Sequence, residues 1–278
     1  MNDTLQQIAE GIEGAIALSG LWLLWRLVLS PDAKQRARPP ALTFWAISTE
    51  KFFMCVWVVL VGGFLAAAAG SYLTPSLGLP HDMAILVAGS AMHFGIIAGV
   101  IISSIWVLQA KPQPAPRVQV PAVLIGLTVF LIVMPVVSAL SLFSDWLLTA
   151  LKFPTEKQDL VEMLMGTDSV LVKATIIVLA VFIAPIGEEL VFRAGLFRYL
   201  RGRAPRWVAL TAPALLFAAL HVTQGSLNGL VAVIPLVGLA IVFSLAYERS
   251  GRISTTIIAH ALFNLNSAAF AIITASKG

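Results

Sequence analysis

The stretch SVLVKATIIVLAVFIAPIGEELVFRAGLFRYL (169–200) decides the fold, because it is long and apolar enough to cross a membrane as a helix. A crossing needs about 20 mostly apolar residues, since a helix rises ~1.5 Å per residue. Three charged side chains nevertheless stand close together in its second half: Glu188, Glu189 and Arg193. Charges at membrane depth are costly and commonly mark a functional site. The stretch therefore predicts a membrane span with a polar site inside it.

The rest of the chain has the composition of a membrane protein. Its 278 residues are 59% hydrophobic and only 12% charged, with a mean hydropathy of +0.91, whereas soluble domains carry about 25% charged residues. Eight segments are long and apolar enough, or nearly so, to span a bilayer: about 12–29, 52–73, 83–108, 119–148, 169–200, 207–222, 227–247 and 253–275. We therefore expect an all-α polytopic membrane protein, a bundle of about eight transmembrane helices.

The connections between these segments alternate in charge. Arginine and lysine gather at 30–51, 109–118 and 193–206 and around the turn at 249–252, whereas the connection at 149–168 is acidic. By the positive-inside rule, the basic connections face the cytoplasm and both termini lie outside it. The acidic N-terminus lacks the basic start of a signal peptide, and the Ala-, Gly-, Pro- and Arg-rich composition favours a bacterial inner (plasma) membrane.

Two connections carry further expectations. KPQPAPRVQVP (111–121) has three prolines in its first six residues, which predicts a stiff linker. It divides an N-terminal three-helix portion, residues 1–118, from a C-terminal portion of about five helices, residues 119–278. The acidic connection at 149–168 is expected either to form an amphipathic turn or two on the outer membrane surface or to be a solvated connector.

Helix geometry separates the charges of the opening stretch. Adjacent residues on a helix diverge by ~100°, so Glu188 and Glu189 cannot face one point. Arg193 follows Glu189 by four residues and shares its face, which predicts an ion pair. Glu188 has Phe192 at that spacing and no local partner. Glu188 is therefore the better candidate for chemistry.

Other polar groups lie in later spans at matching depth. His221 ends the sixth expected span, and His260 and Asn264 share one face of the eighth, four residues apart. Counted from the basic connections, they and Glu188 can reach one cavity in the cytoplasmic half of the membrane. His93, in the third expected span, and His81, in a loop, are interpreted instead as ordinary packed, hydrogen-bonded side chains.

Three short motifs resemble those of a known family. GEELVFR (187–193), FAALH (217–221) and HALFN (260–264) are similar to the motifs of the CAAX-protease and bacteriocin-processing (CPBP, or Abi) family of intramembrane glutamic endopeptidases. All three occur in order, on three expected spans. The resemblance covers about 120–275, and residues 1–118 carry no motif. It implies a catalytic membrane domain in the C-terminal portion.

The resemblance also implies roles for matching positions. Glu188 would be the catalytic carboxylate that, with His221, deprotonates a water for attack on a peptide carbonyl. His260 and Asn264 would stabilise the resulting oxyanion. Supporting roles fall to three further positions of the motifs: Glu189, Arg193 and Phe217. The chemistry would need neither a Ser or Cys nucleophile nor a cofactor.

Alternatives to the metal-free protease differ from it either in the cofactor or in the class of protein. Glu188, His221 and His260 could hold Zn²⁺ with water in the fourth position. The chain could also be a non-catalytic immunity or scaffold protein, or a transporter with a proton relay. Beyond the lipid bilayer, the expected partner is a peptide or protein segment that reaches the cavity from the membrane or the cytoplasm. A prenylated substrate is less expected in a bacterium, and no nucleic acid is expected.

Overall fold

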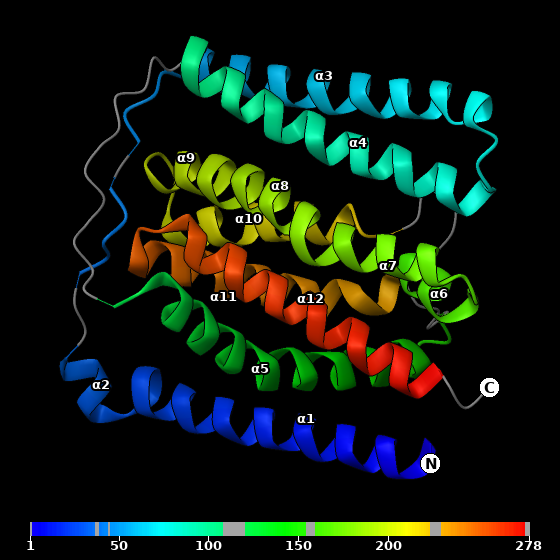
Figure 1. Ribbon diagram of the computed structural model, residues 1–278. Helices are drawn as coiled ribbons and strands as arrows, with labels where there is room; N and C mark the ends of the chain where they lie inside the picture. The colour runs from blue at the N-terminus through cyan, green and yellow to red at the C-terminus, as the bar shows by residue number, and fades with distance from the viewer. Residues whose placement is uncertain are drawn as a thin grey trace.

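The computed structural model describes most of the chain. The described residues are 2–36, 39–43, 45–107, 120–153, 159–222 and 229–275. These residues form helices and connections, with no strand among them. The longer helices lie side by side and run alternately up and down the bundle (Figure 1).

The helices follow the expected spans closely. Their bounds are α1 Asn2–Leu24, α2 Pro31–Gln35, α3 Thr49–Leu73, α4 His81–Ile102, α5 Ala122–Ala150, α6 Asp159–Gly166, α7 Val170–Val178, α8 Ala184–Glu189, α9 Arg198–Arg201, α10 Arg206–Ala219, α11 Val233–Ser250 and α12 Ile253–Ala275. Short 3-10 and π-helical segments, labelled η, join or extend several of them; η4 (Leu179–Ile183) and η5 (Leu190–Phe197) make α7 to α9 one continuous rod.

Seven helical stretches of the described chain are long and apolar enough to cross a membrane. The eighth expected span, 207–222, is α10, an apolar helix of 14 residues. At ~1.5 Å per residue it is about 21 Å long and falls short of a ~30 Å hydrocarbon core. The protein is therefore an integral membrane protein of the all-α class, as expected, with one short helix that ends near His221.

The motif-bearing helices occupy the middle of the bundle. In Figure 1, α1 packs against α5 at one edge, and the α3–α4 hairpin covers the α7–α9 rod at the opposite edge. The expected boundary at 118/119 and most of the linker at 111–121 lie outside the described residues. The division into two portions stays a prediction, but α4 contacts the rod that carries the first motif.

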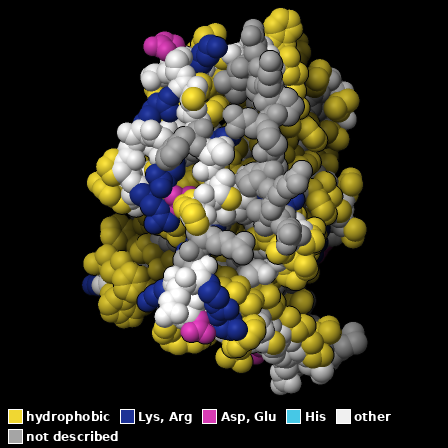
Figure 2. Space-filling model, turned by 90° about the vertical axis from the view of Figure 1, so that its left-hand side faces the viewer, with side chains coloured by type: hydrophobic (Ala, Val, Ile, Leu, Met, Phe, Trp, Pro, Cys, Tyr) yellow, Lys and Arg dark blue, Asp and Glu magenta, His cyan; other side chains and the backbone are white. Residues whose placement is uncertain are grey.

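The two ends of the bundle differ in charge. Both termini lie at one end (Figure 1), and the opposite end, shown in Figure 2, carries many of the Lys and Arg side chains. There Glu248 on α11 pairs with Arg201 at 2.5 Å and with Arg206 at 2.6 Å. Hydrogen bonding to Glu248 raises the pKa of Arg206 above its ordinary value. These pairs tie α9, α10 and α11 together at the basic end.

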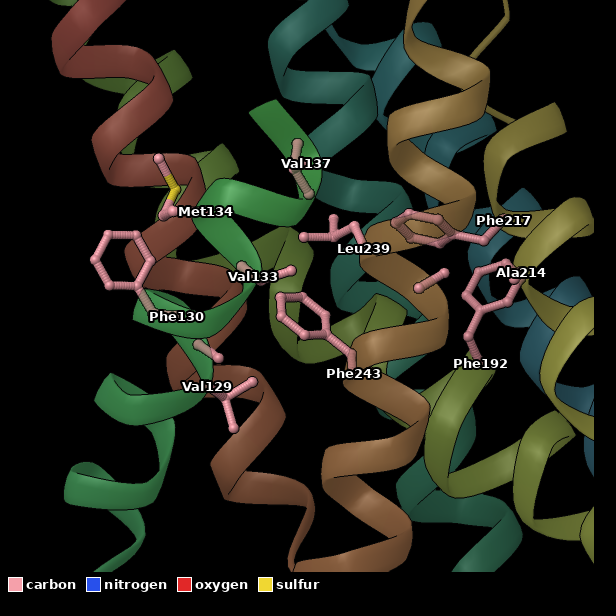
Figure 3. Close-up of a cluster of buried hydrophobic side chains, with 12 residues drawn as sticks. Val129, Phe130, Val133, Met134, Val137, Phe192, Ala214, Phe217, Leu239 and Phe243 are labelled. Carbon is pink, nitrogen blue, oxygen red and sulfur yellow. The ribbon is translucent and has the colours of Figure 1, made fainter. Parts of the chain in front are cut away.

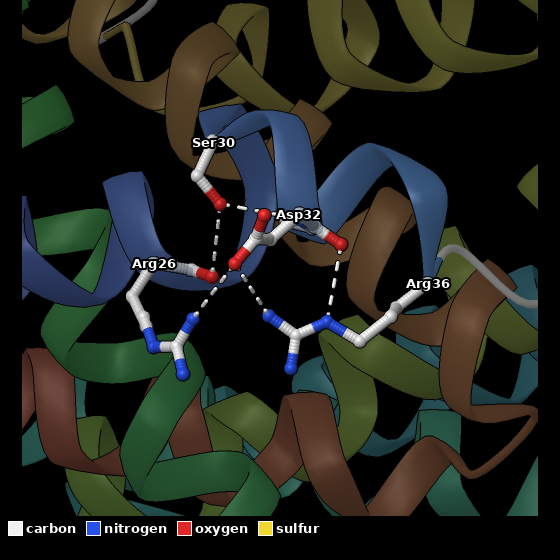
Figure 4. Close-up of polar contacts among 5 residues, drawn as sticks. Arg26, Ser30, Asp32 and Arg36 are labelled. Atoms are coloured by element: carbon white, nitrogen blue, oxygen red, sulfur yellow. Dashed lines mark hydrogen bonds and ion pairs between the residues drawn. The ribbon is translucent and has the colours of Figure 1, made fainter.

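The helix α2 sits at the same end and begins with a regular cap. The Ser30 hydroxyl accepts a hydrogen bond from the backbone N–H of Ala33, and Pro31 occupies the first helical position. Asp32 pairs with Arg26 at 3.9 Å and Arg36 at 3.5 Å (Figure 4). All three side chains are well exposed, so each pair adds at most about 1 kcal/mol.

The acidic connection contributes a short helix at 159–166, in agreement with the expected amphipathic turn or two. Its place on the outer membrane surface stays a prediction, and residues 154–158 lie outside the described residues. The helix α6 packs on α7 and α12. Its Leu164 is buried in a cluster with Leu86, Val172 and Ile176. Residues 159–166 are therefore helical and not a solvated connector, because their apolar side chains close the end of this cluster.

The main core lies between α5, α11 and the motif-bearing helices. Figure 3 shows its buried side chains, among them Val133 on α5, Leu239 and Phe243 on α11, Phe192 on η5 and Phe217 on α10. Large apolar side chains elsewhere point outward, as a lipid-facing surface requires. Phe217 and Phe243 connect this core to the polar site described next.

Candidate active site

The first motif lies on an unusually wide helical segment. The helix α8, which ends at Glu189, is preceded by the π-helical η4 and followed by the π-helical η5. In a π-helix each N–H bonds a carbonyl five residues back, which leaves an extra residue per turn; such turns are frequent at functional sites. Because of the π-helical turns, Glu188 and Glu189 point in directions that differ from those they would have if residues 170–201 formed a regular α-helix.

Pro185 leaves one carbonyl of η4 without its backbone donor. The Ala184 N–H bonds Leu179 O, five residues back, and the next donor in this pattern would be Pro185, which has no N–H. The Asn264 side chain supplies the missing donor, because its Nδ2 lies 2.7 Å from Ala180 O. Asn264 thus joins α12 to the rod through one of the two N–H bonds of its amide.

Glu189 and Arg193 form the predicted ion pair. Arg193 Nη1 lies 3.0 Å from Glu189 Oε1, and both side chains are at most 1% exposed. The N–H bonds are not aligned on the carboxylate, since neither Nη atom of Arg193 has a hydrogen-bond partner among the described residues. The pair is therefore held by charge in a medium of low dielectric constant.

His260 bridges the two glutamates. Its Nδ1 lies 3.0 Å from Glu189 Oε1, and its Nε2 lies 3.6 Å from Glu188 Oε2. The carboxylate of Glu189, paired with Arg193, accepts, so Nδ1 carries the proton. The Nε2 distance is too long for a direct hydrogen bond. The Nδ1 atom of His260 is thus bound to Glu189, whereas its Nε2 atom faces Glu188 and is free to take part in chemistry.

Glu188 is the accessible member of the two glutamates. Its side chain is 19% exposed, whereas that of Glu189 is fully buried. Among the described residues, its one ion-pair contact is the 3.6 Å approach of His260. The geometry therefore separates the carboxylates as the helix argument predicted: one is sealed and neutralised, and the other is left open.

His221 is held by the end of α10. Its backbone N–H bonds Ala218 O, so the carbonyl of Phe217 lacks its usual partner at a helix end. The His221 Nδ1 fills this position at 2.7 Å. A carbonyl only accepts, so Nδ1 donates, and Nε2 of the neutral ring is the basic atom. No hydrogen bond or ion pair within the described chain joins His221 to Glu188.

Aromatic rings surround the charged centre. The Phe217 ring centroid lies 4.6 Å from that of His221 and 6.2 Å from that of His260. The guanidinium carbon of Arg193 lies 4.9 Å from the Phe217 centroid and 5.5 Å from that of Phe243. These cation–π contacts stabilise the buried cation. Phe217 thus contacts both histidines and Arg193, and its supporting role stays a prediction. Phe243 was missed, since nothing marks it in the sequence of α11.

His93 departs from its interpretation as an ordinary hydrogen-bonded side chain. Its Nδ1 is buried and has no hydrogen-bond partner among the described residues. It packs against Gly187 of the first motif, because a Cβ built on Gly187 would lie 3.2 Å from this atom. The signal was present in the sequence: an ionisable residue within an apolar span. His81, at the start of α4, is exposed.

A metal centre was one alternative for these residues. Within the described part of the chain, no group of three or more His, Cys, Asp and Glu side chains is arranged to hold a metal ion. Nδ1 of His260 faces Glu189 and Nδ1 of His221 faces the Phe217 carbonyl, so each histidine has only Nε2 left for a metal. The choice between a metal-free and a zinc-dependent site stays a prediction.

Comparison with known proteins agrees with the motifs. Residues 171–266 match the family model described as Type II CAAX prenyl endopeptidase Rce1-like. The match confirms the family recognised from the motifs and contains all three of them. It covers about a third of the chain and leaves α4 outside. No curated protein and no solved structure matched the chain.

Proposed function

We propose that this protein, whose residues 171–266 belong to the Rce1-like family of type II CAAX prenyl endopeptidases, is an intramembrane endopeptidase that hydrolyses its substrate with a water activated by Glu188. One observation carries the proposal. His260 stands between two carboxylates, 3.0 Å from buried Glu189 and 3.6 Å from accessible Glu188, inside a membrane bundle. Such a pair of unlike environments separates a structural carboxylate from a reactive one.

The reaction begins with proton transfer from water to Glu188. The water oxygen bonds the peptide carbonyl carbon as Glu188 takes the proton. The C–N bond of the tetrahedral intermediate then breaks, and the proton passes to the leaving amine. His221, whose free Nε2 can accept a hydrogen bond, helps Glu188 to orient the water. The fixed tautomer of His221 follows from its bond to Phe217 O.

His260 and Asn264 act on the oxyanion. When His260 Nε2 carries a proton, it can donate to the developing negative charge, and Glu189 holds the ring in the required orientation. The second N–H of the Asn264 amide can donate in the same way while the first remains on Ala180 O. Donors fixed in advance in a low-dielectric site are worth most in the transition state. Arg193 and Phe217 support the arrangement without touching the substrate.

We further propose that the enzyme needs no metal and acts on a membrane-associated peptide or protein. The first point rests on the two histidines, which are held by Glu189 and by Phe217 O and can therefore act on a water without a metal. The basic end of the bundle supports a cytoplasmic orientation of that end, with both termini on the other side of a bacterial inner membrane. The substrate segment would then reach Glu188 from the bilayer or the cytoplasm.

Cleavage of defined peptides tests the function. The purified protein in detergent is given a quenched fluorescent peptide that ends in a CAAX sequence, with and without a farnesyl group on its cysteine. Wild type should cleave at least one form, and Glu188→Gln should lose at least about 10³-fold in kcat. Glu162→Gln on α6, outside the site, is the matched control. Equal turnover by Glu188→Gln and wild type would contradict the role of Glu188 as the base, and no cleavage of either peptide by wild type would point to another class of protein.

The same peptide-cleavage assay also tests whether the enzyme depends on zinc. A chelator that removes bound metal, followed by added Zn²⁺, should leave the rate unchanged. Loss of activity on chelation and recovery with zinc would contradict the metal-free mechanism and retain the peptidase.

A further inference from the structure

His93 brings a third histidine to the site from outside the matched family segment. It lies on α4, which packs on α8 and on the π-helical segments that flank it. Its ring interacts electrostatically with both Glu188 and His221, which are the base and its partner in the mechanism above. The ionisable groups of two separate elements thus lie within electrostatic reach of one imidazole that has no role in the proposed reaction.

His93 can lie close to the backbone of Gly187 because glycine has no side chain. A Cβ on Gly187 would lie 3.2 Å from His93 Nδ1 and 3.6 Å from Ile96 Cγ2. Nearly all real Cβ contacts are looser than the first of these, so the ring would have to shift by a few tenths of an ångström. Gly187 directly precedes Glu188 in the chain. The ring therefore lies against the backbone that carries the proposed base.

The hydrogen bonding of His93 is incomplete. Nδ1 is buried, and no partner for it exists among the described residues. Leaving a buried polar atom unpaired costs free energy, and such atoms in native proteins call for a bound water, a ligand or a functional role. A histidine with a purely structural role would be expected to satisfy this atom.

We propose, resting on the proposed function, that His93 is a positioning residue: its ring, packed against the backbone of Gly187, holds the Glu188 carboxylate in the orientation that attack requires. It acts through Glu188 and does not touch the substrate. The N-terminal portion, which carries no family motif, thereby contributes to the active site.

Kinetics of three variants test the assignment, with the farnesylated and unmodified CAAX peptides as probes. His93→Phe keeps the ring size and removes both nitrogens; kcat should fall about tenfold or more while KM stays within about twofold. His93→Asn places an amide near the position of Nδ1 and should keep at least about a third of wild-type kcat. His81→Phe, on the same helix but exposed, is the matched control and should equal wild type.

Stability separates positioning from structure. Since Nδ1 has no partner to lose, His93→Phe should unfold in detergent at the wild-type temperature or above it. A clear fall in unfolding temperature would overturn the proposal, and so would an unchanged kcat. If His93→Phe fails to fold, His93→Asn decides: activity within about threefold of wild type supports the role, and a larger loss in a folded protein contradicts it.

The close contact between His93 and Gly187 allows a second, independent experiment. Gly187→Ala should lower kcat by displacing the ring, and it should have no further effect in a His93→Ala background, where no ring remains to be displaced. Additive losses would overturn the proposed contact. An inactive wild type, or a Glu188→Gln variant as active as wild type, would be a failure of the proposed function. An active wild type, an inactive Glu188→Gln and a fully active His93→Phe would be a failure of this inference alone.

Discussion

Glu189 and His260, 71 positions apart in the sequence, meet at 3.0 Å in the sealed interior of the bundle. The contact fixes which nitrogen of His260 faces Glu188. It also uses the same carboxylate oxygen that lies 3.0 Å from Arg193. Glu189 is therefore the centre of a three-residue charged group, and its removal should disturb both the fold and the catalytic histidine.

Glu189→Gln should destabilise the protein by about 3–5 kcal/mol, because it leaves the buried Arg193 cation without a counter-charge. Thermal unfolding in detergent measures the loss. Restoring neutrality should recover much of it, so Glu189→Gln combined with Arg193→Met should be more stable than Glu189→Gln alone. If the double variant were the weaker of the two, the ion pair would not be what holds these helices.

The hydrogen bond from Asn264 to Ala180 O predicts that a second substitution, at Pro185, restores the stability that is lost when Asn264 is replaced. Asn264→Ala should cost about 1–3 kcal/mol, since a partly buried carbonyl loses its donor. Pro185→Ala restores a backbone N–H next to that carbonyl and should return stability to the Asn264→Ala variant. It should not return activity, because the second amide N–H is lost with Asn264. Unfolding temperature and peptide cleavage, measured on the same samples, distinguish the two roles.

His221 allows its two nitrogens to be tested separately. His221→Asn can still donate near the position of Nδ1 to Phe217 O, so the end of α10 should stay folded, but the basic Nε2 is lost. We expect near-wild-type unfolding temperature and a fall of about 10² or more in kcat. His221→Phe should lose activity and some stability together. Full activity in His221→Asn would remove this histidine from the mechanism.

Much of this architecture could be predicted from hydropathy, because a membrane span must satisfy its backbone hydrogen bonds internally and therefore forms a continuous apolar helix. The Glu189–Arg193 pair followed from spacing on one helix turn. The contact of Glu189 with His260 could not, since it depends on how α12 packs on α8. Neither could the donor role of Asn264, which depends on a π-helical register that shifts the unpaired carbonyl to Ala180.

His93 shows a different limit of the sequence argument. The sequence predicts an ordinary packed side chain at this position, because a single histidine in a membrane helix is more often structural. Only the packing of α4 against Gly187 brings it near Glu188. Ionisable residues in apolar spans therefore need to be judged by neighbours from every helix and not by motif membership.

The pairs of Glu248 with Arg201 and Arg206 predict a structural effect at the basic end. Glu248→Gln should lower stability by about 1.5–3 kcal/mol, because the charge-assisted hydrogen bonds from two arginines to a nearly buried carboxylate are weakened. The pKa of Arg206 is raised in the fold, so its contribution is complete below its ordinary pKa and is lost only as pH rises above it. The difference between wild type and Glu248→Gln should consequently stay constant from pH 6 to pH 9. Unfolding temperatures across that pH range test whether the difference is constant, with Glu10→Gln on α1 as the control. A difference that shrinks steadily with rising pH would show that Arg206 titrates in that range and is not held by Glu248.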